Sequence, residues 1–116
     1  MPVTIYHNPK CSTSRKTLDL LRSKGAAPVI RDYLKEPLTE TELDSLLKLL
    51  GMEPREAIRT KEDEYTKLRL ADPKKTRKEL IAAMVRHPRL IQRPIVVNGK
   101  KAALGRPKPE DALKVL

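Results

Sequence analysis

The sequence predicts an α/β fold built on one mixed sheet, and three observations along its 116 residues support this prediction. An apolar run at residues 3–6 leads into a helix-patterned segment that ends near Ser23, and a strand-like run follows at residues 29–33. Strand, helix and strand within about 30 residues are typical of a βαβ unit with parallel strands. The middle of the chain has helix patterns, and residues 94–104 have the pattern of a hairpin.

The central helices are marked by their start and stop signals. Residues 39–42, Thr-Glu-Thr-Glu, have the spacing of a capping box, four leucines follow on one face, and Gly51 ends the helix. A second capping box at residues 76–79 opens another helix. Between these two helices we expect a short helical turn and a charged helix over about residues 62–70, with Tyr65 and Leu68 facing inward.

The last third of the chain returns to strands. Asn98-Gly99 between two strand-like runs predicts a hairpin closed by a type I′ turn. Pro109 then begins a short closing helix, whose inward residues are expected to be Ala112, Leu113 and Leu116. The predicted order is therefore strand, helix, strand, a run of helices, two strands and a helix.

Cys11 is the single cysteine and lies in the loop between the first strand and the first helix. A thiol at a helix start meets unpaired backbone N–H groups and the positive end of the helix dipole, and both favour the thiolate. Lys10 and Arg15 add positive charge. Cys11 could instead be a small buried hydrophobe, but its polar and charged neighbours favour a reactive nucleophile.

Composition and charge exclude several classes of protein. The formal charge is +10, but 25 Lys and Arg are interleaved with 15 acids and the aromatic residues are three tyrosines. We therefore expect a solvated basic surface that attracts anions, and no nucleic-acid partner. There is neither an apolar run of about 18 residues nor an apolar signal segment, which predicts a cytoplasmic protein without a membrane partner. We expect a monomer without a bound metal ion.

Three arginines lie where regular structure is predicted to stop: Arg59, Arg93 and Arg106. Arg93 and Arg106 each precede a proline, which restricts their backbone toward extended geometry. The planar guanidinium fork matches tetrahedral oxyanions, so three forks near Cys11 would hold a dianion against a thiolate that otherwise repels it. For each arginine alone, solvation at the surface is the alternative interpretation.

These residues together resemble a known family. The stretch at residues 6–15, Tyr-His-Asn-Pro-Lys-Cys-Ser-Thr-Ser-Arg, joined by Arg59, Gln-Arg-Pro-Ile-Val at 92–96 and Leu-Gly-Arg-Pro at 104–107, closely resembles the ArsC family of glutaredoxin-coupled arsenate reductases. The resemblance covers essentially the whole chain. It implies a single ArsC-like domain with a thioredoxin-like (glutaredoxin-like) core at about 1–36 and 90–116 and a helical insertion at about 37–89.

The resemblance also implies roles for single residues. Cys11 would be the nucleophile that attacks arsenate or a similar tetrahedral oxyanion. The residues that bind the oxyanion and lower the thiol pKa would be Arg59, Arg93 and Arg106. Those that support the catalytic loop would be His7, Ser14 and Arg15, and Pro94 would be a structural cis-proline. No cofactor is expected to be bound; glutathione would be the co-substrate that displaces the arsenic-bound intermediate, and glutaredoxin would then reduce the mixed disulfide.

Two neighbouring families fit less well. Phosphatase-like arsenate reductases use a Cys-x5-Arg loop, whereas Thr17 stands at the corresponding position here. Spx-like regulators share the fold and usually carry Cys-x-x-Cys, whereas Ser14 stands at the second position. The alternative function is therefore a redox-sensing or interaction protein related to Spx-like regulators, without arsenate activity. Such a protein would need Cys11 but has no evident use for three arginines beside it.

Overall fold

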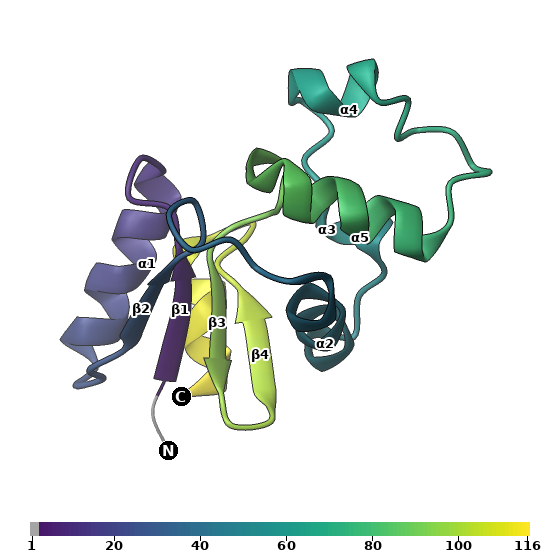
Figure 1. Ribbon diagram of the computed structural model, residues 1–116. Helices are drawn as coiled ribbons and strands as arrows, with labels where there is room; N and C mark the ends of the chain where they lie inside the picture. The colour runs from purple at the N-terminus through teal and green to yellow at the C-terminus, as the bar shows by residue number, and fades with distance from the viewer. Residues whose placement is uncertain (1–2) are drawn as a thin grey trace. The chain divides into compact units, whose positions relative to one another are not determined.

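The computed structural model describes residues 3–116 (Figure 1). Its elements, in chain order, are β1 (Val3–His7), α1 (Ser12–Ser23), β2 (Val29–Asp32), α2 (Glu40–Leu50), α3 (Pro54–Ala57), α4 (Asp63–Lys67), α5 (Arg77–Arg86), the 3₁₀ helix η1 (Pro88–Leu90), β3 (Ile95–Asn98), β4 (Lys101–Leu104) and the 3₁₀ helix η2 (Pro109–Val115). Two compact units result: a sheet unit of residues 3–36 with Arg93–Leu116, and a helical unit, Pro37–Gln92. Within residues 3–116 no helix is both long and apolar enough to cross a bilayer.

The sheet unit contains one four-stranded sheet in the order β2-β1-β3-β4. β1 pairs with β2 in parallel, through α1 as the crossover, and pairs with β3 antiparallel on its other side. β3 and β4 form the antiparallel hairpin. The mixed sheet predicted from the sequence is therefore confirmed, and β1, which carries the chain into the Cys11 loop, is one of its two central strands.

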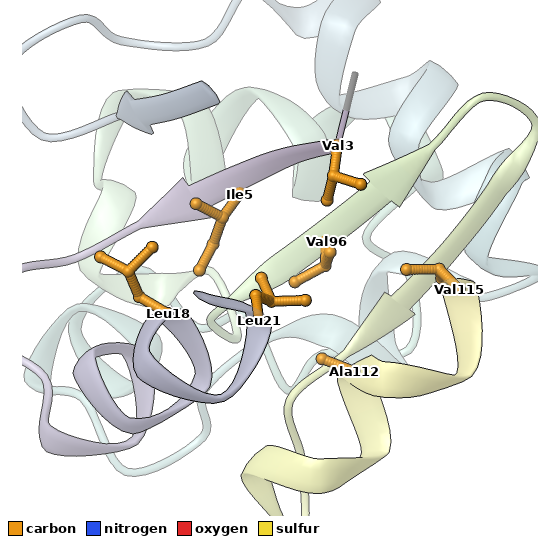
Figure 2. Packing of buried hydrophobic residues seen from close by; sticks show 7 residues of the cluster. All are labelled: Val3, Ile5, Leu18, Leu21, Val96, Ala112 and Val115. Carbon is orange, nitrogen blue, oxygen red and sulfur yellow. The ribbon is translucent and has the colours of Figure 1, made fainter. Parts of the chain in front are cut away.

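The core of this unit lies between the sheet and the two elements α1 and η2. Figure 2 shows side chains of β1 and β3 meeting those of α1 and η2 on one face of the sheet. Its buried members are Val3, Ile5, Leu18, Leu21, Val96, Ala112 and Val115. Ile5 and Val96 are cross-strand partners and fully buried, so the period of two in the strands places them on this face. This packing fixes α1, and with it the loop that carries Cys11.

The hairpin forms as predicted, but with a different turn. Asn98 pairs with Lys101 and still belongs to the ladder, so the two turn residues are Gly99 and Lys100. Among the described residues of this turn only Gly99 has a positive φ, 63°, which is the pattern of a type II′ turn rather than type I′. Asn98 stays in the strand and its side-chain N–H donates to the Val115 carbonyl oxygen over 2.7 Å, which ties the hairpin to η2.

The closing helix buries a different set of residues from the predicted one. Ala112 and Val115 are buried, while Leu113 is half-buried and Leu116 is 47% exposed. The reason is the helix type: a 3₁₀ helix has three residues per turn, so positions 112 and 115 share a face. The prediction that Leu116 faces inward assumed the spacing of an α-helix and is wrong.

The helical unit follows the capping signals closely. Thr39 and Thr76 each accept a hydrogen bond from the backbone N–H three residues on, and the glutamates Glu42 and Glu79 complete the two capping boxes. Gly51 ends α2 in the left-handed conformation, with φ 67°. The buried leucines of α2 are Leu43, Leu46 and Leu47.

α4 is shorter than the helix predicted for this segment. It ends at Lys67, Leu68 is the C-cap, and Arg69 then takes a left-handed φ of 54°. The N–H groups of Arg69 and Leu70 donate to Thr66 and Tyr65, which is the hydrogen-bond pattern of a Schellman motif. This turn buries Leu70 and leaves Leu68 38% exposed, so the prediction that Leu68 faces inward is wrong. Glycine usually marks such an ending, and an arginine gives no such signal.

Candidate active site

Cys11 occupies the N-cap position of α1, directly after the loop that leaves β1. Its backbone N–H donates to the Asn8 carbonyl oxygen over 3.0 Å, and the Asn8 side chain accepts from the Lys10 N–H over 2.9 Å. The sulfur is partly exposed and lies against the backbone N–H groups of Thr13 and Ser14. The first turn of α1 contains no acidic side chain that would oppose a negative charge there.

Arg106 joins this loop from the other end of the chain. One terminal nitrogen of Arg106, Nη2, lies 3.6 Å from Cys11 Sγ, although the two residues are 95 positions apart in the sequence. Its Nε donates to the Arg93 carbonyl oxygen over 2.9 Å. Arg93 is itself only 8% exposed, and its side chain lies close enough to the sulfur to lower the Cys11 pKa by hydrogen bonding and by its charge. The structure therefore brings Cys11, Arg93 and Arg106 together.

A glycine allows these two arginine segments to pack against α1. A Cβ added at Gly105 would lie 2.7 Å from Thr17 Oγ1 and 2.9 Å from a ring carbon of Pro94. Both distances are shorter than real Cβ contacts, and Thr17 and Pro94 are buried. The Gly105 N–H also donates to the Pro94 carbonyl oxygen over 3.0 Å. The bare backbone at Gly105 thus lets the residue before Arg106 approach α1.

The peptide bond between Arg93 and Pro94 is cis, the geometry expected for Pro94. A second cis bond, which the sequence analysis did not anticipate, joins Arg106 to Pro107. Both arginines that contact Cys11 thus stand directly before a cis-proline.

His7 and Ser14 form a buried pair beneath the loop. Ser14 Oγ lies 2.6 Å from His7 Nδ1 and accepts a hydrogen bond from the Asn8 backbone N–H over 3.1 Å. Burial lowers the pKa of His7; the Asp32 charge opposes this effect, and the Arg15 and Arg22 charges add to it. Because the lowered pKa favours neutral imidazole at pH 7, Nδ1 can accept a hydrogen bond from the Ser14 hydroxyl. The pair therefore ties the end of β1 to the first turn of α1.

Arg15 supports the same loop from its exposed side. Its Nη1 donates to the Pro9 carbonyl oxygen over 2.8 Å, which links the helix to the residue two positions before Cys11. His7, Ser14 and Arg15 thus all contact the Cys11 loop, where the sequence analysis places them. Their roles in a reaction stay predictions.

The pKa of Cys11 lies below the ordinary value for a thiol. Burial alone would raise it, but the Ser14 backbone N–H, the Arg93 side chain and the Thr13 backbone N–H each stabilise the thiolate, and the Arg93 charge adds to them. The direction is the one predicted from the loop position. A larger fraction of Cys11 is therefore thiolate, the reactive form, at neutral pH than of an ordinary cysteine.

We expect the alkylation rate of folded Cys11 to rise with pH about a midpoint below about 8.5, the ordinary thiol value. Only the thiolate reacts, so a lowered pKa moves the rise to lower pH. Iodoacetamide labelling followed by intact-mass spectrometry measures this, and the urea-unfolded protein supplies the same single thiol without its site. A folded midpoint at or above that of the unfolded protein contradicts the lowered pKa.

Arg59 lies in the helical unit, directly after the short bridge that Ile58 forms with Ile91. Its Nε is 3.6 Å from a carboxylate oxygen of Glu62. Its predicted part in binding an oxyanion stays a prediction. In the described range 3–116, no three His, Cys, Asp or Glu side chains are grouped so that they could hold a metal ion.

The sequence pattern indicated no structural role at the site for Gly105, Thr17 or Glu62. A glycine directly before Arg106-Pro107 is a signal of close backbone approach that could have drawn attention to Gly105. Thr17 and Glu62 carry no such signal, because their contacts depend on partners that the sequence does not place.

Comparison with known proteins identifies the family of this chain. The ArsC family model matches residues 6–114. The chain belongs to the ArsC family. It is 50% identical over 115 residues to the uncharacterized protein YfgD of Escherichia coli, covering 98% of this chain and 96% of that protein. It is 47% identical to the arsenate reductase of Haemophilus influenzae, with full coverage of both chains.

A solved structure of the family supports the fold. The structure of an arsenate reductase from Vibrio cholerae superimposes on this ArsC-family chain with a TM-score of 0.96. The two sequences are 48% identical, and the match covers all of this chain and 98% of the other. The thioredoxin-like fold implied by the resemblance is thereby confirmed.

Proposed function

We propose that this chain reduces arsenate to arsenite, with Cys11 as the nucleophile. The observation that supports this best is the pairing of a thiolate-favouring cysteine with the Arg106 guanidinium 3.6 Å from its sulfur. A thiolate beside arginine forks is suited to an electrophile that carries oxyanion charge. The arsenate reductases of Haemophilus influenzae and Vibrio cholerae are matched over at least 98% of their lengths, which favours arsenate as the oxyanion.

Binding of the oxyanion comes first. Arg93 and Arg106 already contact the sulfur, so an arsenate dianion placed against it would meet two guanidinium groups that offset the repulsion between two negative partners. Arg59 is the third ligand in this proposal. The exposed Lys10 and Arg15 add positive charge around the loop and favour the approach of an anion.

Covalent attack follows. The Cys11 thiolate forms a sulfur–arsenic bond, and one arsenate oxygen takes up protons and leaves as water. Arsenic is still As(V) at this stage, so no electron has been transferred to it. The arginines stabilise the negative charge that the remaining oxygens carry, and because they are already in place, little reorganisation is needed at the moment of reaction.

Reduction requires a second thiol. The chain has a single cysteine, and Ser14, at the Cys-x-x-Cys position, is turned toward His7 and Asn8. Glutathione therefore attacks Cys11 Sγ: the new sulfur–sulfur bond forms, the sulfur–arsenic bond breaks, and its electron pair leaves with arsenic as arsenite. Glutaredoxin then accepts the glutathionyl group and releases the Cys11 thiolate. Such a cycle belongs in the cytoplasm, where the glutathione pool keeps thiols reduced.

We expect purified protein to convert arsenate to arsenite only when both glutathione and glutaredoxin are present. Arsenite is measured by separating the two oxyanions, and NADPH oxidation through glutathione reductase gives the stoichiometry of one NADPH per arsenite. Omitting either thiol component is the control. Formation of a Cys11–glutathione disulfide without any arsenite would overturn the proposal in favour of a redox-sensing protein related to Spx-like regulators.

A further inference from the structure

Glu62 holds two arginines at once within the helical unit. One carboxylate oxygen, Oε1, is 3.6 Å from Arg59 Nε, and the other, Oε2, accepts a hydrogen bond from Arg89 Nη2 over 3.4 Å. The side chain of Glu62 is 14% exposed, against 25% for Arg59 and 66% for Arg89. The carboxylate is thus the most enclosed member of the cluster, which shields its ion pair with Arg59 from water.

The backbone of Arg59 is already fixed before its side chain is considered. Ile58 and Ile91 form an antiparallel bridge, and the Arg59 N–H donates to the Leu90 carbonyl oxygen over 2.7 Å. A long side chain on a fixed backbone still has many rotamers, and ordering them costs entropy. Glu62 stands three residues on, at the N-cap position of α4, and its carboxylate charge, 3.6 Å from Arg59 Nε, favours the rotamers that keep the guanidinium beside it.

Arg89 offsets the negative charge that Glu62 brings to Arg59. A carboxylate paired with Arg59 alone would cancel the charge that attracts an oxyanion. With Arg89 on its second oxygen, the three side chains Arg59, Glu62 and Arg89 together carry a formal charge of +1. The same carboxylate can therefore orient Arg59 without removing its attraction for anions.

We propose that Glu62 is a positioning residue that orients Arg59 for oxyanion binding, and that Arg89 balances its charge. This inference rests on the proposed function, in which Arg59 is an oxyanion ligand. It adds to that function a pair of residues that touch neither the nucleophile nor the attacked atom in the proposed reaction.

Three variants separate orientation from charge: Glu62→Gln, Arg89→Gln and the double variant. The formal charge of the cluster becomes +2 in Glu62→Gln, 0 in Arg89→Gln and +1 in the double variant. The double variant therefore has the charge of the wild type but lacks the carboxylate. We expect the KM for arsenate to rise about fivefold in the double variant, the upper range for partly exposed ion pairs. The kcat should stay within about twofold, because an interaction made equally in the bound substrate and the transition state changes KM alone.

The single variant Glu62→Gln is an independent test, because the two interpretations predict opposite changes in the KM for arsenate. If Glu62 only weakened the positive field, its neutralisation would lower the KM for arsenate. If Glu62 orients Arg59, the KM rises despite the added positive charge. Asp44→Asn is the matched control, because Asp44 also bridges two cations of the helical unit, with Arg77 Nε at 2.9 Å and Lys48 Nζ at 3.1 Å.

All variants are compared with Asp44→Asn in thermal unfolding and in arsenate reduction. The inference is supported if the double variant and Glu62→Gln raise the KM for arsenate while Asp44→Asn, which loses a similar amount of melting temperature, leaves the KM unchanged. It is overturned, and the proposed function survives, if the wild type reduces arsenate and the KM of the double variant stays within twofold of it. A wild type that does not reduce arsenate overturns the proposed function and this inference together.

Discussion

The Cys11→Ser variant is expected to produce arsenite no faster than a reaction mixture without the protein, while its fold stays intact. A serine hydroxyl is uncharged at neutral pH, and the groups that stabilise the Cys11 thiolate cannot ionise an alcohol in the same way. No sulfur–arsenic bond and no mixed disulfide with glutathione can form. Arsenite production with glutathione and glutaredoxin present measures this loss.

The serine variant also separates chemistry from binding. Cys11 is partly exposed and lies outside the buried core, so the free energy of unfolding should change by less than about 0.5 kcal/mol. Arg93 and Arg106 remain, and we expect calorimetry to detect arsenate binding to the variant. Arsenite production by Cys11→Ser at the wild-type rate would show that another group is the nucleophile.

Local signals in the sequence were sufficient for most of the fold. Capping boxes at Thr39 and Thr76 mark the starts of α2 and α5, and the strand pattern before Cys11 leads into a helix, as predicted. These features depend on residues within four positions of one another, where propensity and capping act directly. The position of Cys11 at a helix start belongs to the same class, as does the part of its lowered pKa that comes from the Thr13 and Ser14 backbone N–H groups; the part that comes from Arg93 does not.

The predictions that were wrong, for the segments around Arg69 and in η2, share a different cause. Arg69 takes the left-handed conformation that glycine usually signals, and η2 turns as a 3₁₀ helix, so Leu116 faces outward. In both segments tertiary packing selects the conformation: Leu70 is buried after Arg69, and Val115 is buried in the core with its carbonyl held by Asn98. The residues within a few positions of Arg69 and Leu116 do not indicate these tertiary contacts.

In the candidate site, too, some features could be predicted from the sequence and others depend on tertiary contacts. The sequence shows that Cys11, Arg93 and Arg106 carry suitable chemistry, and the family resemblance predicts that they meet. The packing of Gly105 against Thr17, which brings the Arg106 segment close to α1, can be seen only in the three-dimensional structure. The same is true of Glu62, whose partner Arg89 is 27 residues away in the sequence.

Replacing Arg106 by alanine is expected to lower kcat/KM for arsenate by about 10²–10³, the usual cost of removing one charged donor that acts in the transition state. Arg106 makes two contacts at once: Nη2 lies 3.6 Å from Cys11 Sγ, and Nε donates to the Arg93 carbonyl oxygen over 2.9 Å. Lysine should restore little of the activity, because a single ammonium group cannot hold both partners in the geometry of the guanidinium fork. Lys108→Ala is the matched control, since it removes one exposed positive charge two residues further on.

The pH dependence of alkylation and of activity separates two effects of an arginine, the one on the thiol pKa and the one on oxyanion binding. Arg93 stabilises the thiolate through both a hydrogen bond and its charge, so Arg93→Ala should move the Cys11 alkylation midpoint upward, toward the ordinary thiol pKa. Activity lost only because of this shift would return at higher pH, where the thiolate forms again. Activity lost because the oxyanion has lost a ligand would not return, and we expect this second result for both Arg93→Ala and Arg106→Ala. If either alanine variant reached the wild-type rate at high pH, that arginine would act on the thiol pKa alone and not on arsenate.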